Sequence, residues 1–185
     1  MKKILILASL LLVLPVTCAA QKFTLSANML DYLNFGTLSI GGAYGLDRNW
    51  SLDFTAKYNP FTFHEGQAGK QFQNRQQAYS VGFRWWPWHL WSGWWMSGAV
   101  KYQEYNAGGL FSPSTEEGDR VGAGIAAGYS LMVHKHLNLD FGIGFWSGWS
   151  RFTRYSCPSC GRIEKSGQRI FILPDNVLMS LVYVF

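Results

Sequence analysis

The sequence of 185 residues has little charge and no long internal hydrophobic run. Charged residues make up 15% of the chain, well below the quarter that is usual in soluble domains. Outside the N-terminus, no apolar run approaches the roughly eighteen residues that a membrane-spanning helix needs. The 20 Gly and 9 Trp also argue against helical bundles and coiled coils, which are rich in Ala, Leu, Glu and Lys. If this chain crosses a membrane, it therefore does so with strands.

The sequence also lacks a basic run. Its formal net charge of +5 is spread along the chain, which is not the footprint of a nucleic-acid-binding protein. The one local excess lies between Arg151 and Arg169, where five basic residues face the single acid Glu164. This segment is expected to form a positive loop, and we expect no nucleic-acid partner.

The N-terminus has the three parts of a secretory signal peptide. Lys2 and Lys3 precede an apolar stretch over residues 4–14, and small residues end the segment at Ala19 and Ala20. This pattern predicts a signal peptide over residues 1–20 and a mature domain over residues 21–185. An alternative makes Cys18 a lipidated N-terminus. In both cases the protein leaves the cytoplasm.

Apolar residues recur with a period of two almost everywhere in the mature domain. In residues 50–58, for example, Trp50, Leu52 and Phe54 alternate with Ser51 and Asp53. Such alternation predicts strands with one apolar face. Eight segments show it, near residues 22–30, 37–46, 50–58, 77–86, 94–105, 120–133, 137–149 and 176–185.

The two faces of these strands differ in size as well as polarity. In residues 137–149, Leu139, Phe141 and Ile143 alternate with Gly142 and Gly144. A soluble protein would have to turn the large residues inward and show glycine to water, which is unusual. A membrane barrel places large residues against lipid and small ones inside. The predicted fold is therefore all-β, an eight-stranded antiparallel transmembrane β-barrel with both termini periplasmic, in the outer membrane of a Gram-negative bacterium.

The lengths of the connections alternate as this topology requires. Three connections are short, at residues 47–49, 87–93 and 134–136, and are expected on the periplasmic side. Three others, over residues 59–76, 106–118 and 150–174, are expected to be long surface loops. The first connection, at residues 31–36, is brief. Six Trp residues between Trp85 and Trp95 predict an aromatic belt at the periplasmic interface.

Several segments together resemble a known family. They are residues 58–63 (Tyr-Asn-Pro-Phe-Thr-Phe), 84–86 (Arg-Trp-Trp), 102–109, 122–124 with 128–129, and 155–161, which contains Cys-x-x-Cys-Gly. In this order they resemble an uncharacterised Bacteroidota-type family of outer-membrane barrel proteins, over nearly the whole mature chain. Members are often encoded beside fimbrillin-type subunits, so the resemblance implies a link to fimbriae or another surface assembly. It implies no catalytic residues.

Two groups of residues are candidates for a structural role. Cys157 and Cys160 lie in the seventh connection, and a local disulfide is favoured there over free thiols, a zinc site or a thioredoxin-like pair. A second group of charged side chains points toward the barrel interior: Asp53, Lys57, Arg84, Lys101, Arg120 and Asp140. These are expected to form a balanced polar network that fills the interior, with an ion or proton path as the alternative.

We expect a non-enzymatic barrel that anchors or accompanies a surface assembly through its extracellular loops, with no cofactor or metal. Its partners would be outer-membrane lipids and fimbrial or other surface proteins. The predicted contact residues are aromatic and basic residues of these loops: Phe61, Phe63, Phe72, Phe111, Phe152, Arg154, Tyr155 and Arg162. One alternative is a lipid A modifying hydrolase or acyltransferase, for which His64 beside Glu65 is the only histidine on the correct side. Another is a passive structural barrel.

Overall fold

The computed structural model describes residues 22–64, 71–109, 114–157 and 161–185. The predicted signal peptide and Cys18 lie outside these ranges. In the described part of the chain, no helix is long and apolar enough to cross a membrane.

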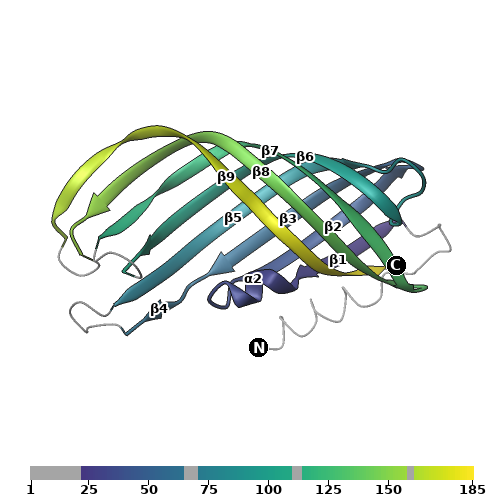
Figure 1. Cartoon of the computed structure of the whole chain (residues 1–185), viewed down its shortest axis with the longest axis horizontal. Coiled ribbons are helices and arrows are strands. Elements are labelled where there is room, and N and C mark those ends of the chain that lie inside the picture. Colours follow the sequence, from purple (N-terminus) through teal and green to yellow (C-terminus); the bar gives the residue numbers. More distant parts are fainter. Residues whose placement is uncertain (1–21, 65–70, 110–113, 158–160) are drawn as a thin grey trace, which may run out of the picture.

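The fold is all-β, and its strands belong to one antiparallel sheet. In chain order the elements are β1 (Phe23–Asn28), α2 (Met29–Leu33), β2 (Leu38–Asp47), β3 (Trp50–Asn59), β4 (Thr62–Phe63), β5 (Phe72–Trp85), β6 (Gly93–Gly108), β7 (Thr115–His134), β8 (Leu137–Tyr155) and β9 (Ile163–Val184). β3 pairs with β5 and β1 pairs with β9, so eight strands close into a ring, to which the short β4 is added at β5. Figure 1 shows these tilted strands around a common axis. The eight predicted strands are thus confirmed.

The large side chains lie on the outer face of the ring. Along β7, Val121, Ile125 and Tyr129 are exposed, whereas Gly128 and Ser130, on either side of Tyr129, are buried. On β8, Phe141, Ile143 and Phe145 are likewise exposed. The structure therefore confirms that the apolar face of each strand points outward and the small or polar face points inward.

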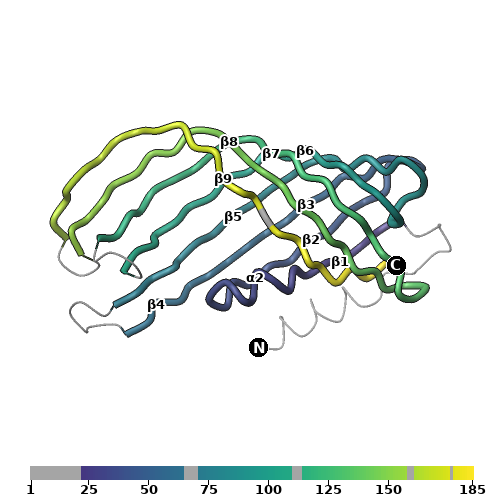
Figure 2. Tube along the Cα trace, in the orientation of Figure 1, coloured from purple at the N-terminus to yellow at the C-terminus, as the bar shows by residue number. Residues whose placement is uncertain are grey.

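One end of the ring carries the short turns and both ends of the described chain. Residues 48–49 join β2 to β3, residues 86–92 join β5 to β6, and residues 135–136 join β7 to β8. Phe185 lies beside Phe23 at the same end, with its backbone N–H donating to the Phe23 carbonyl at 3.0 Å. The three short connections were predicted correctly. The tube in Figure 2 follows these turns at the end opposite the tips of β8 and β9.

The predicted long loops are mostly strand, which corrects the sequence analysis. β5 already begins at Phe72, β6 continues to Gly108, β7 begins at Thr115, and β8 and β9 reach Tyr155 and Ile163. The cause is a change in composition rather than in backbone conformation. On β7 the residues that precede Val121, from Thr115 to Arg120, are no longer apolar on either face, so the apolar alternation stops. Backbone pairing with β8 continues there.

β1 is much shorter than the strands on the other side of the ring. The chain leaves it at Asn28, whose side-chain Oδ1 accepts the N–H of Leu30 at 3.2 Å and thereby caps α2. The same oxygen accepts the N–H of Met179 on β9 at 3.2 Å. Because β1 ends here, opposite Ser180, the rest of β9 extends beyond it.

Candidate functional site

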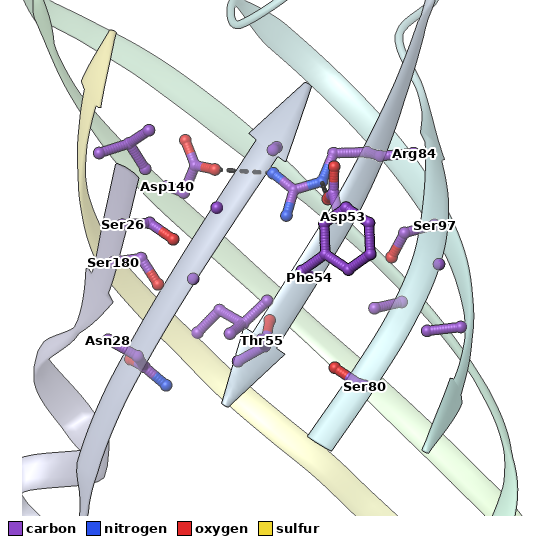
Figure 3. A pocket seen from close by; sticks show the side chains of 18 of the residues that line it. Ser26, Asn28, Asp53, Phe54, Thr55, Ser80, Arg84, Ser97, Asp140 and Ser180 are labelled. Carbon is purple, nitrogen blue, oxygen red and sulfur yellow. Dashed lines mark hydrogen bonds and ion pairs between the residues drawn. The ribbon is translucent and has the colours of Figure 1, made fainter. Parts of the chain in front are cut away.

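The ring encloses a cavity of about 120 Å³. Hydroxyl groups and small residues form much of its wall, and Figure 3 shows Ser26, Ser80, Ser97 and Ser180 around it. This is the inward face that the sequence alternation predicted. The charged groups of the wall are paired with one another, as the following contacts show.

Arg84 on β5 is the centre of the interior network. Its Nε lies 2.7 Å from Asp53 Oδ2, as an ion pair rather than an aligned hydrogen bond, and its Nη1 donates to Asp140 Oδ2 at 2.8 Å. The guanidinium also lies over the ring of Trp95, 4.2 Å from its centroid. Three of the six predicted interior residues are therefore brought together around one cation (Figure 3).

Two further cations pair with acids that the sequence analysis did not assign to the interior. Lys57 Nζ donates to Asp31 Oδ1 at 2.8 Å, and Lys101 Nζ contacts Asp175 Oδ1. Asp31 was assigned to a surface turn but belongs to α2, which turns it inward. Asp175 lay between the predicted loop over residues 150–174 and the predicted strand over residues 176–185, but it belongs to β9, which runs through Pro174.

Arg120, the sixth predicted interior residue, stacks on aromatic rings instead of pairing with an acid. Its guanidinium carbon lies 3.7 Å from the ring centroid of Tyr105 and 5.8 Å from that of Phe171. Its Nε is buried without a hydrogen-bond partner among the described residues. Cation–π contact stabilises the charge at this position.

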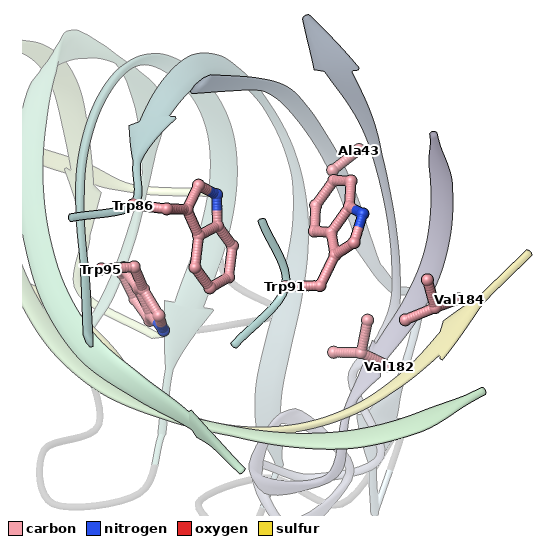
Figure 4. Packing of buried hydrophobic residues seen from close by; sticks show 6 residues of the cluster. All are labelled: Ala43, Trp86, Trp91, Trp95, Val182 and Val184. Carbon is pink, nitrogen blue, oxygen red and sulfur yellow. The ribbon is translucent and has the colours of Figure 1, made fainter. Parts of the chain in front are cut away.

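The end of the ring that carries the short turns is filled by three indole rings. Trp86, Trp91 and Trp95 are almost fully buried and pack near Val182 and Val184 (Figure 4). We call these three residues the tryptophan plug. It corrects the predicted aromatic belt: only Trp85, Trp88 and Trp94 point outward. Adjacent residues on a strand face opposite sides, so the pairs 85–86 and 94–95 each contribute one ring to either face.

On the outer face, the apolar surface ends at a defined row. Tyr102, Val121, Trp149 and Ile170 are exposed cross-strand neighbours on β6 to β9. The next outward positions form what we call the polar row: Gln77, Glu104, Asp119, Arg151 and Gln168. β6 to β9 continue past this row by several residues. These extensions form a curved wall, the upper shell, which rises at the end opposite the short turns (Figure 1).

A partly exposed charge cluster stabilises the concave face of the upper shell. Glu116 on β7 accepts hydrogen bonds from Tyr105 Oη at 2.7 Å and Arg154 Nη2 at 3.0 Å, and it also pairs with Arg169. Burial alone would raise the pKa of Glu116. The two hydrogen bonds and the charge of Arg169 outweigh it, so the pKa lies below its ordinary value.

This cluster predicts a local response to acid. A carboxyl with a lowered pKa in the folded state contributes stability above its unfolded pKa of about 4.3, and that contribution is lost as pH falls through the folded value. We therefore expect amide protection at the tips of β7 to β9 to be constant from neutral pH to about pH 5 and to decrease below about pH 4. Hydrogen–deuterium exchange, corrected for intrinsic rates, measures this. Glu116→Gln should remove the acid-dependent step, and a step that persists in this variant would contradict the assignment.

The structure separates the predicted contact residues into different environments. Phe152 is 8% exposed, with Arg169 stacked 4.6 Å from its ring centroid, so it is an inward residue and not a surface contact. The physical reason is that β8 continues past the predicted start of the loop, and the alternation turns residue 152 inward. Arg154 and Tyr155 lie at the tip of β8, paired with Glu116 and Glu117. Arg162 is exposed, and Phe111 lies outside the described residues.

The remaining predicted aromatics form a cluster at the rim. Phe63 stacks on Phe72 with ring centroids 5.7 Å apart, and Phe61 and Phe35 flank Phe63 at 6.3 Å and 6.2 Å. Phe35, Phe61 and Phe63 are all more than one third exposed. Phe35 was missed because its segment was expected to be only a brief turn. We call these four residues the rim aromatic cluster.

Cys157 is disulfide-bonded. Cys160 lies outside the described residues, so the pairing of these two cysteines stays a prediction.

His64, the residue on which an enzymatic reading depends, is exposed at the end of β4 with φ 55°. In the described part of the chain no side chain hydrogen-bonds to it, and its neighbour Glu65 lies outside that part. Among the described His, Cys, Asp and Glu residues, no three are grouped as metal ligands.

The comparison with protein families identifies the family of this chain. No curated protein matches the sequence. Residues 5–185 match the family described as "Protein of unknown function (DUF3575)". Since this match covers almost the whole sequence, the chain belongs to the DUF3575 family.

Proposed function

We propose that the chain is a transmembrane β-barrel of the bacterial outer membrane, with both termini in the periplasm. In this account the outer apolar face meets lipid and the tryptophan plug lies at the periplasmic end. The upper shell and the rim aromatic cluster extend from the cell surface and bind another surface component without catalysing a reaction. Partners of this kind include fimbrial and other surface assemblies.

The height of the apolar band supports this proposal. On β6 the outward residues from Trp94 to Tyr102 span eight positions, which corresponds to about 26 Å along the strand. With the strand tilted by about 40°, this is about 20 Å along the axis, close to the apolar band of outer-membrane barrels. Aromatic residues lie at both limits, as expected at a membrane interface.

The observation that carries the proposal is the extension of β5 to β9 past the polar row. A barrel that served only to fill the membrane would need no paired strands beyond its apolar band. Here the extensions carry an ion cluster at Glu116, and the exposed rim aromatic cluster lies beside the tip of β5. Rigid scaffolds that present exposed aromatic residues are typical of binding surfaces.

The rim aromatic cluster provides a test of the binding role. The double variant Phe61→Ser, Phe63→Ser should reduce partner recovery by about tenfold or more, since aromatic anchors carry much of the energy of an interface. Recovery is measured by cross-linking on intact cells, followed by mass spectrometry. Trp88→Ser is the matched control, because Trp88 is 60% exposed at the opposite end. Equal loss in both variants, or in neither, would argue against a partner at the rim.

The main alternative is a lipid A modifying enzyme that uses His64. Under the binding role, His64→Ala should leave the lipid A profile of the cells unchanged, since one exposed histidine without an orienting partner is a poor catalytic base. Mass spectrometry of lipid A from wild-type, deletion and variant strains distinguishes the binding role from catalysis. A difference that depends on the gene and disappears with His64→Ala would replace the binding role by catalysis.

A further inference from the structure

β9 has a long edge with no neighbouring strand. From Ile163 to Leu173 it pairs with β8 on one side. On the other side, no strand of the described chain pairs with it, because β1 ends at Asn28, opposite Ser180. We call residues 163–173 of β9 the free edge. Figure 1 shows it as the yellow outer strand of the upper shell.

The free edge offers backbone groups that face no neighbouring strand in the described chain. In an antiparallel sheet, alternate residues direct both their N–H and their C=O toward the same neighbour. About half of the residues of the free edge therefore direct these groups away from β8. Every residue from Ile163 to Ile170 is exposed, so an incoming strand could reach them.

The end of the free edge is marked in the sequence. Pro174 follows Leu173 directly, and proline cannot donate to a ladder, so it occurs in sheets mainly on edge strands. Toward the C-terminus of β9, α2 lies beside the strand, and Asn28, which caps α2, accepts the N–H of Met179. The free edge is thus bounded at one end by Pro174 and α2, and at the other by the tip of β9 at Ile163.

The side chains of the free edge indicate what could pair with it. Lys165 and Arg169 have the parity of the buried Phe171 and lie on the concave side, where Arg169 also pairs with Glu116. Ile170 and Ile172 lie on the convex side, at and just inside the limit of the apolar band, and are 73% and 75% exposed. Only Glu164 is acidic in this stretch. A segment with acidic residues on one face and apolar residues on the other would match both sides through cross-strand pairs.

A second copy of this chain fits the edge poorly. Two free edges paired with each other would bring Lys165 and Arg169 of one copy against the same basic residues of the other. Charged side chains at an edge commonly prevent such self-pairing. The same charges attract an acidic partner.

We propose that the free edge of β9 accepts an extended, acidic segment of another surface protein as an additional strand. This is strand addition at a sheet edge, in which main-chain hydrogen bonds give affinity and alternate side chains give specificity. The inference rests on the proposed function, which places residues 163–168, from the tip of β9 to the polar row, outside the membrane, and it names the chemistry of the partner.

The test uses the full mature chain inserted in phosphatidylcholine vesicles. The probe is a ten-residue peptide of alternating Val and Glu with blocked ends, and its control is the same peptide with Lys in place of Glu. The acidic peptide should slow amide exchange in residues 163–173 by about tenfold or more. Lys165→Glu should weaken peptide binding about tenfold, whereas Arg48→Glu, the same charge change at the opposite end, should not. Lys165→Gln provides a milder variant with an intermediate effect.

Three results would overturn the inference. They are unchanged exchange in residues 163–173 with millimolar acidic peptide, equal protection by the Lys peptide, and protection that grows with protein concentration without peptide. The last result would assign the edge to a second copy. Flotation of the chain with vesicles is scored separately. If the chain floats but binds no peptide, only this inference is wrong. If the chain does not insert, the proposed function is wrong as well.

Discussion

Replacing Arg84 by Met should prevent stable folding or reduce the free energy of unfolding by about 3–5 kcal/mol, because it leaves buried carboxylates without their cation. Arg84 is the partner of both Asp53 and Asp140, and it also covers the ring of Trp95. The measurement is urea unfolding of the refolded chain in detergent, with the shift between unheated and heated gel migration as a check on the folded state. Arg75→Met is the matched control, since Arg75 is exposed on the same strand.

A compensating variant separates loss of charge balance from loss of packing. Arg84→Met combined with Asp53→Asn and Asp140→Asn removes the unpaired charges and should recover most of the lost stability. An unfolding midpoint that Arg84→Met leaves unchanged would show that the interior network contributes nothing to stability. A triple variant as unstable as the single one would assign the effect to the lost contact with Trp95.

Gly128→Leu should be as damaging, through packing instead of charge. A Cβ atom at Gly128 would lie 2.1 Å from the carbonyl oxygen of Phe141 and 2.4 Å from Cζ2 of Trp95. Neither group can move without displacing β8 or the tryptophan plug, so we expect a loss of about 3 kcal/mol or more. The matched control is Ala127→Leu, because Ala127 immediately precedes Gly128 on β7 and is exposed on the outer face.

The same gel shift and urea unfolding measure this pair of variants. Ala127→Leu should fold like the wild type, since an added apolar side chain on this face points out of the ring beside the exposed side chains of Met96 and Ile143. Equal stability of Gly128→Leu and wild type would mean that the plug does not pack against β7 as described. Destabilisation by Ala127→Leu alone would mean that the faces of β7 are reversed.

The fold could be predicted from the sequence because the apolar period of two is strong within the band that carries the large side chains. On β7 the large residues Val121, Ile125 and Tyr129 alternate with small residues, and this alternation identifies both the strand and its exposed face. The pattern stops where both faces become polar, as at Glu116 and Glu117. Backbone pairing continues there without apolar alternation, so the strands were predicted too short.

The interior network could be predicted only in part. Asp53, Arg84 and Asp140 lie within clearly alternating strands, so their inward direction followed from the sequence. Asp31 is directed inward by a five-residue helix, and Asp175 by a strand that continues through Pro174. Both depend on tertiary pairing that local patterns do not contain. The free edge of β9 also depends on tertiary pairing, because it exists only where the neighbouring strand β1 has ended.

Contact between lipid and the outer face of the ring can be measured with a fluorophore on Ile125→Cys. Ile125 is 74% exposed at the middle of β7, and Lys165 on the free edge supplies the comparison site. The labelled chains are inserted in vesicles and exposed to lipids brominated on the acyl chain or to aqueous iodide. We expect bromolipids to quench the label at position 125 and iodide to quench the label at Lys165→Cys. Quenching of position 125 by iodide, with no effect of bromolipids, would contradict contact with lipid.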